Sequence, residues 1–386
     1  MRLATFAHLI AADDAAETAA QDVDVASPRA QLLDIDLDGR DEAFMTEPGQ
    51  VVGVKLEEGA GIGRWDILAV RHALTAVMRR RPEAYHWKLL EKADKADESR
   101  EPAEAATSGE PAEAAGSAGD ARTEAVEAEA PAGAPAPVSI HELVASKETG
   151  LSRYLRYDAY ERRSSLVHLL AQDVRPEAFA DGQFDEVGDF VDRPFEVVEL
   201  APGRLVVARE GSVGSGSGEA AQAVRVEKRL SLGGGRRDPV LGQEVIVRNR
   251  SAEPLSLRVG VEWSLMLLGG GGNPAAFHEV GGQRTPHDST GTATAIGHFS
   301  AGNTDVGVMV STKLSPPGDV WWSPIETVSN SEGGFERIYQ GSSVLVSWPV
   351  DLGPGASFSV SIENRVSTDR DADLGEPEGA MPAAHQ

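Results

Sequence analysis

Short apolar runs of strand length, several of which alternate between apolar and polar residues, are the feature that most constrains this chain. Residues 50–55 and 343–350 are two such runs, each of the length of one strand and bounded by residues typical of turns. A parallel sheet would need helical crossovers of a dozen or more residues, and after residue 180 the runs follow one another too closely for that. We therefore predict a mainly β fold, a large antiparallel sandwich of two sheets. The other runs are 204–209, 223–232, 244–248, 255–268, 306–311 and 357–366.

The acidic charge is concentrated outside these runs. The chain has 61 acidic and 36 basic residues, and twelve of the acids with only four bases fall within residues 91–130, which contain no aromatic residue. Such a segment cannot bury enough apolar surface to offset its chain entropy, so we predict a disordered acidic insertion over 92–137. We also expect a short N-terminal helix. The predicted domains are a helical remnant and linker over 1–27, the sandwich over 28–366 with its insertion, and a disordered tail over 367–386.

Composition also excludes several classes of function. A formal net charge of −25 argues against nucleic acid and anionic membrane surfaces as partners, because both repel an acidic protein. The absence of cysteine excludes disulfides, thiolate zinc sites and cysteine nucleophiles. No apolar run approaches the roughly 18 residues that span a bilayer, and the first residues lack the long apolar region of a signal peptide. These features favour a cytoplasmic protein.

Acidic residues at alternate positions suggest one metal site. Asp34, Asp36 and Asp38, followed by Gly39 and Glu42, match the first half of a calcium-binding loop. Met45 stands where such a loop requires its bidentate glutamate, so the segment is not an EF-hand. A strand that exposes the three aspartates on one face gives the same pattern. Calcium is the only cofactor that the sequence suggests, and both interpretations stay open.

Two segments combine arginine with aromatic residues in an otherwise acidic chain. They are 78–86 and 157–168, and they flank the acidic insertion. Surfaces of this composition are typical of protein interfaces. The alternative is that Asp158, Glu161 and the arginines form internal ion pairs, a role that the bidentate guanidinium group suits. The candidate interface residues are Arg80, Tyr85, His86, Tyr157, Arg162 and Arg163.

Carbohydrate contact is suggested by aromatic residues beside carboxylates. Trp321 and Trp322 with Glu326 form one candidate set, and Trp263 with Glu262 forms another. Core packing is the alternative role for these tryptophans, and structural pairing is the alternative for a glutamate in so apolar a strand. The sequence contains no GxSxG, HExxH, Walker or strand-linked GxGxxG motif, so we assign no catalytic residue.

Several of these motifs, in this order, resemble the C-terminal half of glycoside hydrolase family 57, of the α-amylase and 4-α-glucanotransferase type. They are DLDGRDE at 36–42, RRPEAYH at 80–86, YDAYERRS at 157–164 with His168, and the closing run 322–341 with Trp348-Pro349. The resemblance extends from about residue 30 to 366, with the acidic stretch as an insertion. It implies a sandwich similar to those of mutarotases, in carbohydrate metabolism.

The resemblance also implies where catalysis resides. Family members carry their nucleophile and acid on an N-terminal (β/α)7 barrel, and residues 6–13 look like the last turns of the helical domain that follows it. No residue here can inherit those catalytic roles. We therefore expect a non-catalytic sandwich that binds an α-glucan, a maltooligosaccharide or a separately encoded catalytic barrel. The alternative is a glycoside hydrolase or glucanotransferase that acts through acids and histidines of the sandwich itself, namely Glu262, His278, His287 and Asp288.

Overall fold

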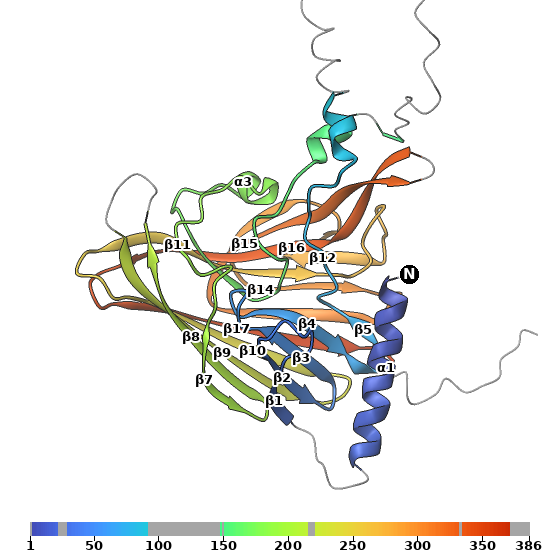
Figure 1. Ribbon diagram of the computed structural model, residues 1–386, viewed down its shortest axis with the longest axis horizontal. Coiled ribbons are helices and arrows are strands. Elements are labelled where there is room, and N and C mark those ends of the chain that lie inside the picture. The colour runs from blue at the N-terminus through green and yellow to red at the C-terminus, as the bar shows by residue number, and fades with distance from the viewer. Residues whose placement is uncertain are drawn as a thin grey trace, which may run out of the picture. The chain divides into compact units, whose positions relative to one another are not determined.

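The structure is a computed structural model that describes residues 2–21, 29–91, 147–148, 150–214, 221–331 and 334–370 (Figure 1). The described residues of Met1–Arg81, Arg156–Thr327 and Ile338–Gln386 form one compact unit, and those of Pro82–Leu155 and Val328–Arg337 form a second. The predicted disordered insertion 92–137 and most of the predicted tail 367–386 lie outside the described residues. None of the helices within the described ranges is both long enough and apolar enough to cross a membrane.

A five-stranded antiparallel sheet forms one layer of the first unit. Its strands follow one another in space as they do in sequence. Connections of two to eight residues join them, as expected for a meander. The strands are β1 (Arg29–Leu33), β2 (Glu42–Glu47), β3 (Gln50–Lys55), β4 (Gly61–Ile67) and β5 (His72–Ala73).

A larger antiparallel sheet of twelve strands forms the other layer, in the order β13-β12-β14-β15-β17-β10-β9-β8-β7. A branch β16-β11-β6 leaves this path at β15. The strands are β6 (Leu166–Leu170), β7 (Glu196–Ala201), β8 (Arg204–Val213), β9 (Gln222–Gly234), β10 (Pro239–Asn249), β11 (Leu255–Leu265), β12 (Ala276–Val280), β13 (Gln283–Pro286), β14 (Gly291–Asn303), β15 (Val308–Ser331), β16 (Gly334–Leu352) and β17 (Ser357–Thr368).

The branch depends on the length of β15. Residues 308–315 of this strand pair with β17, and β15 also pairs with β16. Pro316 and Pro317 follow the segment paired with β17, and their nitrogens cannot donate to a sheet ladder. Their carbonyls accept hydrogen bonds from the indole nitrogen of Trp348 at 3.2 and 3.0 Å. One strand thus belongs to both branches of the large sheet.

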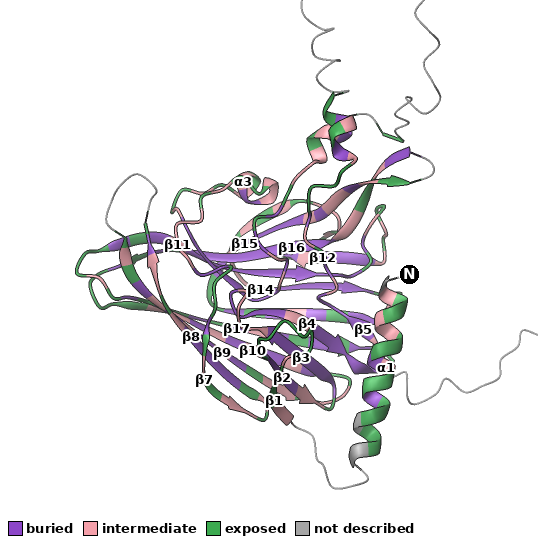
Figure 2. Cartoon of the chain, viewed as in Figure 1, coloured by how far each residue is buried: buried purple, intermediate pink, exposed green. Residues whose placement is uncertain are grey.

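One hydrophobic core joins the two sheets. It contains Val52 and Trp65 from the smaller sheet and Val245 and Trp263 from the larger. The two tryptophan rings lie 5.9 Å apart, and the indole nitrogen of Trp65 donates to Gln50 at 2.9 Å. Figure 2 shows the buried residues along the strands of both layers. The prediction of a mainly β fold with two antiparallel sheets is confirmed.

Helix α1 (Arg2–Gln21) runs beside β5 in the same unit (Figure 1). Most of its described side chains are exposed (Figure 2), but Ile10 is buried against Phe44 and Val51 of the smaller sheet. Asp14 forms an ion pair with Arg236 at 2.7 Å. The N-terminal helix that the sequence predicts is therefore present and packed on the sandwich. The described residues also include two 3-10 helices, η1 (Leu68–Val70) and η2 (Leu151–Tyr154), the short helix α3 (Pro176–Asp181), and a helical segment at residues 86–91.

The second unit has a small core of its own. Leu89, Leu151, Val328 and Phe335 are buried in it, and Tyr85 packs against them. The hydroxyl of Tyr85 and the Nε2 atom of His86 both donate to the carbonyl of Val328, at 3.5 and 3.0 Å.

Candidate functional site

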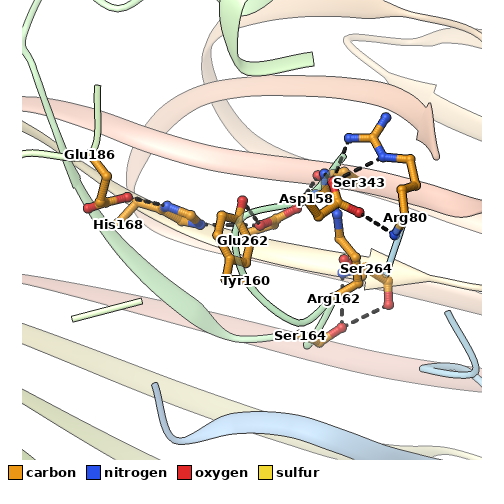
Figure 3. A network of polar contacts seen from close by, with 10 residues as sticks. All are labelled: Arg80, Asp158, Tyr160, Arg162, Ser164, His168, Glu186, Glu262, Ser264 and Ser343. Carbon is orange, nitrogen blue, oxygen red and sulfur yellow. Dashed lines mark hydrogen bonds and ion pairs between the residues drawn. The ribbon is translucent and has the colours of Figure 1, made fainter. Parts of the chain in front are cut away.

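The candidate site is built around a glutamate inside the large sheet. Glu262 lies on β11, where Val261 and Trp263 point into the core between the sheets and Glu262 points to the opposite face. Its side chain is fully buried. Four side chains donate hydrogen bonds to its carboxylate, two to each oxygen (Figure 3). The donors are Tyr160 at 2.9 Å, Arg162, His168 at 3.2 Å and Ser343 at 2.6 Å.

Strand register explains how these donors meet. His168 on β6 lies opposite Gly260, and Ser343 on β16 lies opposite Ser264, so both side chains share the outer face of β11 with Glu262. Tyr160 and Arg162 come from the irregular segment that precedes β6. Ser164 in the same segment donates through Oγ to the carbonyl of Ser264 at 2.9 Å, and the Ser264 amide donates back at 3.0 Å. This exchange holds the segment against the sheet.

His168 connects Glu262 to a second carboxylate. Its Nδ1 atom donates to Glu186 at 2.6 Å, and the other oxygen of Glu186 accepts the amide of Leu169 at 2.7 Å. Burial disfavours the imidazolium, but the charges and hydrogen bonds of Glu186 and Glu262 outweigh burial and raise the pKa of His168 to about 9. Because this pKa lies above 7, His168 is protonated at neutral pH. Burial also raises the pKa of Glu186.

Arg162 connects Glu262 to a third carboxylate, that of Asp158. Arg162 donates to both acids, and Asp158 also accepts the side chain of Arg80 at 2.6 Å and its backbone amide at 2.8 Å. Burial opposes ionisation of both acids, but the neighbouring cations outweigh burial and lower the pKa of Asp158 and that of Glu262. Figure 3 follows this chain of contacts from Glu186 to Arg80. Three cations (Arg80, Arg162, His168) balance three carboxylates (Asp158, Glu186, Glu262).

A cleft of about 300 Å³ opens in front of this network. Arg162, one of the lining residues, has an Nε–H group without a hydrogen-bond partner within the described part of the chain, and its side chain is only 6% exposed. A buried donor of this kind favours a ligand oxygen as its acceptor. The cleft is lined by Tyr157, Asp158, Ala159, Tyr160, Arg162, Gly182, Phe184, Glu186, Gly188, Asp189, Val191, Asp192 and Arg193.

The cleft is richer in acceptors than in free donors. Four of its lining residues are carboxylates, and each is fixed by a cation, as Asp189 is by Arg209 at 3.0 Å and Asp192 by Arg193 at 3.6 Å. A carboxylate oxygen that accepts one hydrogen bond can accept another from a ligand. General acid–base catalysis requires a pKa near the working pH, whereas those of Glu262 and His168 are displaced away from neutrality. The arrangement can therefore orient hydroxyl groups, but these two groups cannot readily exchange protons.

The tryptophans singled out in the sequence lie elsewhere. Trp263 is 3% exposed and packs on Trp65. Trp321 and Trp322 are 7% and 9% exposed and line a second cavity of about 30 Å³, which has room for a water molecule or two. Glu326 is half-buried further along β15. Sugar contact through these tryptophans stays a prediction that would require the cavity to widen.

The histidines of the alternative catalytic set lie apart from Glu262. The rings of His278 and His287 stack with 4.2 Å between their centroids, and Tyr339 contacts Nδ1 of His287 through its hydroxyl. Burial lowers the pKa of His278 to about 4 and lowers that of His287 well below its ordinary value, so both are neutral at pH 7. Ser342 donates to the carbonyl of His287, whereas its neighbour Ser343 donates to Glu262. Successive residues of a strand face opposite sides, so β16 separates the two sets.

Asp288, the remaining member of that set, accepts the amide of Gly272 at 2.8 Å. It is thus engaged with the glycine-rich segment that follows β11.

The candidate calcium ligands converge around a lysine. Lys55 on β3 places its Nζ atom 2.7 Å from Asp36, 2.6 Å from Glu42 and 4.0 Å from Asp38. Asp34 instead accepts the backbone amides of Asp38 and Gly39, both at 3.0 Å. The acidic oxygens are close enough together to surround a cation, and the ammonium group already occupies that position. Calcium binding here stays a prediction.

The candidate interface residues divide between the two units. Arg80 and Arg162 are 3% and 6% exposed and belong to the buried network, whereas Arg163 is half-buried and pairs with Glu58. Tyr157 is 40% exposed at the cleft. Tyr85 and His86 lie in the second unit. The sequence did not single out Glu186, Asp189 or Phe184 as cleft residues, because irregular segments bring them to the cleft and no periodic pattern marks such segments.

Comparison with known proteins identifies the family. Residues 34–117 and 122–362 match the family described as "Alpha-amylase/4-alpha-glucanotransferase, C-terminal". The chain is 27% identical over 366 residues to Alpha-amylase 1 of Dictyoglomus thermophilum, covering 94% of this chain and 44% of that protein. It is 25% identical over 327 residues to the 4-alpha-glucanotransferase of Thermococcus litoralis, covering 84% and 40%. The chain thus spans about two fifths of the length of these relatives.

The solved structure of one relative has the same fold. The crystal structure of the 4-alpha-glucanotransferase from Thermococcus litoralis superposes with a TM-score of 0.62 at 21% identity, covering 95% of this chain and 42% of that one. A galactose mutarotase-like protein from Clostridium acetobutylicum matches with a TM-score of 0.45 at 9% identity, covering 88% and 99%. With the family match over most of its length, the chain belongs to the C-terminal domain family of α-amylases and 4-α-glucanotransferases.

Proposed function

We propose that this chain is a non-catalytic sandwich of α-glucan metabolism that binds carbohydrate in the cleft in front of Arg162 and Glu186. The observation that carries the proposal is the chemistry of the cleft. Arg162 in the lining has a buried Nε–H donor without an acceptor among the described residues, and the rest of the lining is rich in carboxylate oxygens, with aromatic rings beside them. A sugar hydroxyl can accept a hydrogen bond from the Nε–H group and donate one to a carboxylate oxygen, which neither a simple anion nor a simple cation can do.

The size and charge of the cleft support a small neutral sugar. A volume of about 300 Å³ is at the lower end of the range for small-molecule pockets, about 300–1,000 Å³. Four carboxylates against two arginines in the lining disfavour phosphorylated or acidic sugars. The glucan class comes from the relatives, which are named as amylases and glucanotransferases. We therefore propose that the ligand is a maltooligosaccharide end of one or two glucose units.

The test is binding of maltotriose, measured by isothermal titration calorimetry. We expect Tyr157→Ala and Asp192→Asn to weaken binding about fivefold or more, since each removes a contact worth about 1 kcal/mol. Both side chains are exposed at the cleft, so the melting temperature should hardly change. Asp351→Asn, a matched change of an exposed aspartate on β16, should bind as the original chain does. Unchanged affinity in both cleft variants, or tighter binding of glucose 1-phosphate than of maltose, would refute the proposal.

Docking to a separately encoded catalytic barrel is a second proposal, and burial reduces the number of residues that could take part in it. Arg80 and Arg162 are committed to internal ion pairs, so among the interface candidates of the first unit only Tyr157 and Arg163 have surface to offer. The test is co-purification with a barrel from a related amylase, first with the original chain and then with the Arg163→Glu variant. Loss of the complex with the sandwich still folded would support docking through this surface. A complex that survives the change would contradict it.

A further inference from the structure

A lysine is fully buried on the core side of β9. Lys228 is 0% exposed, and its Nζ atom donates to the carbonyls of Gly59 at 3.2 Å, Ala60 at 2.6 Å and Ser165 at 2.6 Å. An ammonium group has three N–H donors, and here each meets one backbone carbonyl. The proposed binding function assigns no role to this residue.

The three carbonyls belong to backbone in an uncommon conformation. Gly59, Ala60 and Ser165 have φ values of 65°, 45° and 65°, in the left-handed region. For alanine and serine this conformation is strained, and it persists only where the surroundings enforce it. Lys228 thus fastens two separate turns, before β4 and before β6, in the conformation that points their carbonyls inward.

Both turns support a wall of the cleft. The Gly59 amide donates to the carbonyl of Arg193 at 3.0 Å, and a Cβ atom at Gly59 would lie 2.3 Å from the carbonyl oxygen of Val191. Val191 and Arg193 line the cleft. The second turn, at Ser165, comes three residues after Arg162, which also lines the cleft.

We propose that Lys228 is the positioning residue of this cleft: its ammonium group ties the two turns together and thereby sets the places of Arg162, Val191 and Arg193. The inference rests on the proposed function for its binding readout, and it goes further by naming a residue that touches no ligand. It also makes binding sensitive to pH. Burial lowers the pKa of Lys228 to about 7, and the neutral amine has only two hydrogens for three carbonyls.

The charged groups of the surrounding elements are paired with one another rather than with Lys228. Glu227 and Arg229 flank Lys228 on β9. Their side chains project from the opposite face of the strand and form an ion pair with each other at 2.7 Å. No carboxylate of the described chain forms an ion pair with its Nζ atom, which is why burial alone sets the direction of the shift. The pairs within the two turns and the cleft wall are Glu58 with Arg163 and Asp192 with Arg193.

The experiment compares Lys228→Met with Lys313→Met, the same change at an exposed lysine on β15. Maltotriose affinity is measured from pH 6 to 8.5, and backbone hydrogen exchange is followed at residues 58–61, 163–165 and 189–193, with β10 as reference. We expect the original chain and Lys313→Met to lose about fivefold in affinity as pH rises through 7, the equivalent of one hydrogen bond. Lys228→Met should bind weakly at every pH, with faster exchange confined to those three segments.

Two outcomes would overturn the inference. One is that Lys228→Met keeps the affinity and pH profile of the original chain, and the other is that its exchange accelerates equally in β10, which indicates general destabilisation. If Lys228→Met does not fold, hydrogen exchange of the original chain tests the inference by itself. Exchange in the three segments, relative to β10, must then become faster between pH 6 and pH 8. If the original chain binds no maltotriose, the proposed function fails, and the exchange data still decide the positioning role.

Discussion

Arg162 and Glu262, one hundred positions apart in the chain, form an ion pair whose side chains are 6% and 0% exposed. Breaking such a pair by removing one partner leaves the other charge buried without compensation, which is more costly than the pair is worth. Arg162 also lines the cleft, so the geometry of the pair affects the proposed binding site. Stability and binding therefore depend on the same side chains here, and the predictions below separate the two.

We expect Glu262→Gln to destabilise the fold by about 3–5 kcal/mol at pH 7, because Arg162 and His168 lose their shared anion. The lowered pKa of Glu262 contributes stability that is present above its unfolded pKa, near 4.5, and is lost as pH falls below it. The difference between the original chain and the variant should therefore shrink on acidification below about pH 4.5. Urea unfolding at pH 7 and pH 4 measures this, with Glu253→Gln in an exposed turn as control.

Adjacent arginines should behave oppositely. Arg80 is 3% exposed and binds Asp158, whereas Arg81 is 64% exposed and pairs with Glu161. Arg80→Ala should cost about 3–5 kcal/mol of unfolding free energy, and Arg81→Ala less than about 0.5 kcal/mol. Denaturant unfolding of the two variants compares them directly. Equal, small effects would mean that Arg80 does not belong to a buried structural network.

Two buried bases should act on stability with opposite signs between pH 7 and 9. The raised pKa of His168, about 9, gives stability that is complete below its unfolded pKa of 6.5 and is lost as pH rises through 9. The lowered pKa of Lys228, about 7 against 10.5 unfolded, makes stability increase over pH 7–10.5. Each slope is about 1.4 kcal/mol per pH unit, so together they nearly cancel.

The cancellation can be removed one residue at a time. In the original chain, the contributions of His168 and Lys228 to the unfolding free energy should nearly cancel from pH 6 to 9. The unfolding free energy should rise with pH in His168→Gln, which retains Lys228. A level profile in His168→Gln would show that Lys228 keeps an ordinary pKa.

The isolated chain should release no reducing sugar from amylose and should not redistribute maltooligosaccharide lengths. The acids of the described cleft are each paired with a cation, and Glu262 and His168 have pKa values displaced away from neutrality. Chromatography of maltooligosaccharides after prolonged incubation is the assay. Turnover that persists through repeated purification and is lost in Asp288→Asn, a change within the alternative catalytic set, would support an enzyme that acts within the sandwich.

Calcium should raise the melting temperature only when Lys55 is removed. The ammonium group of Lys55 lies where a cation would have to bind, 2.6 Å from Glu42 and 2.7 Å from Asp36. Lys55→Met leaves the carboxylates without a counter-charge, so millimolar calcium should stabilise this variant by mass action. Adding Asp36→Asn should abolish the gain. A calcium shift in the original chain would instead support the metal site suggested by the sequence.

The regular part of the fold was accessible from the sequence. Strand-length apolar runs located β3 at residues 50–55 and β11 from residue 255, because these strands bury most of their side chains. The second run also marked Glu262 as an acid inside an apolar strand. The partners of Glu262 were not accessible, since Tyr160, His168 and Ser343 reach it from 81 to 102 positions away. A cleft made by irregular segments leaves no periodic signal in any one of them.

The position of β17 has a consequence for synthesis of the protein. This strand is the last of the described chain, yet it lies in the middle of the large sheet, between β15 and β10. While the chain is being made, β10 has one paired and one bare edge, and a bare edge invites pairing with other chains. The sheet cannot close before residue 368 has left the ribosome. At elongation rates of about 5–20 residues per second, the half-finished layer keeps a bare edge for several seconds, which makes synthesis the stage at which pairing with another chain competes most with folding.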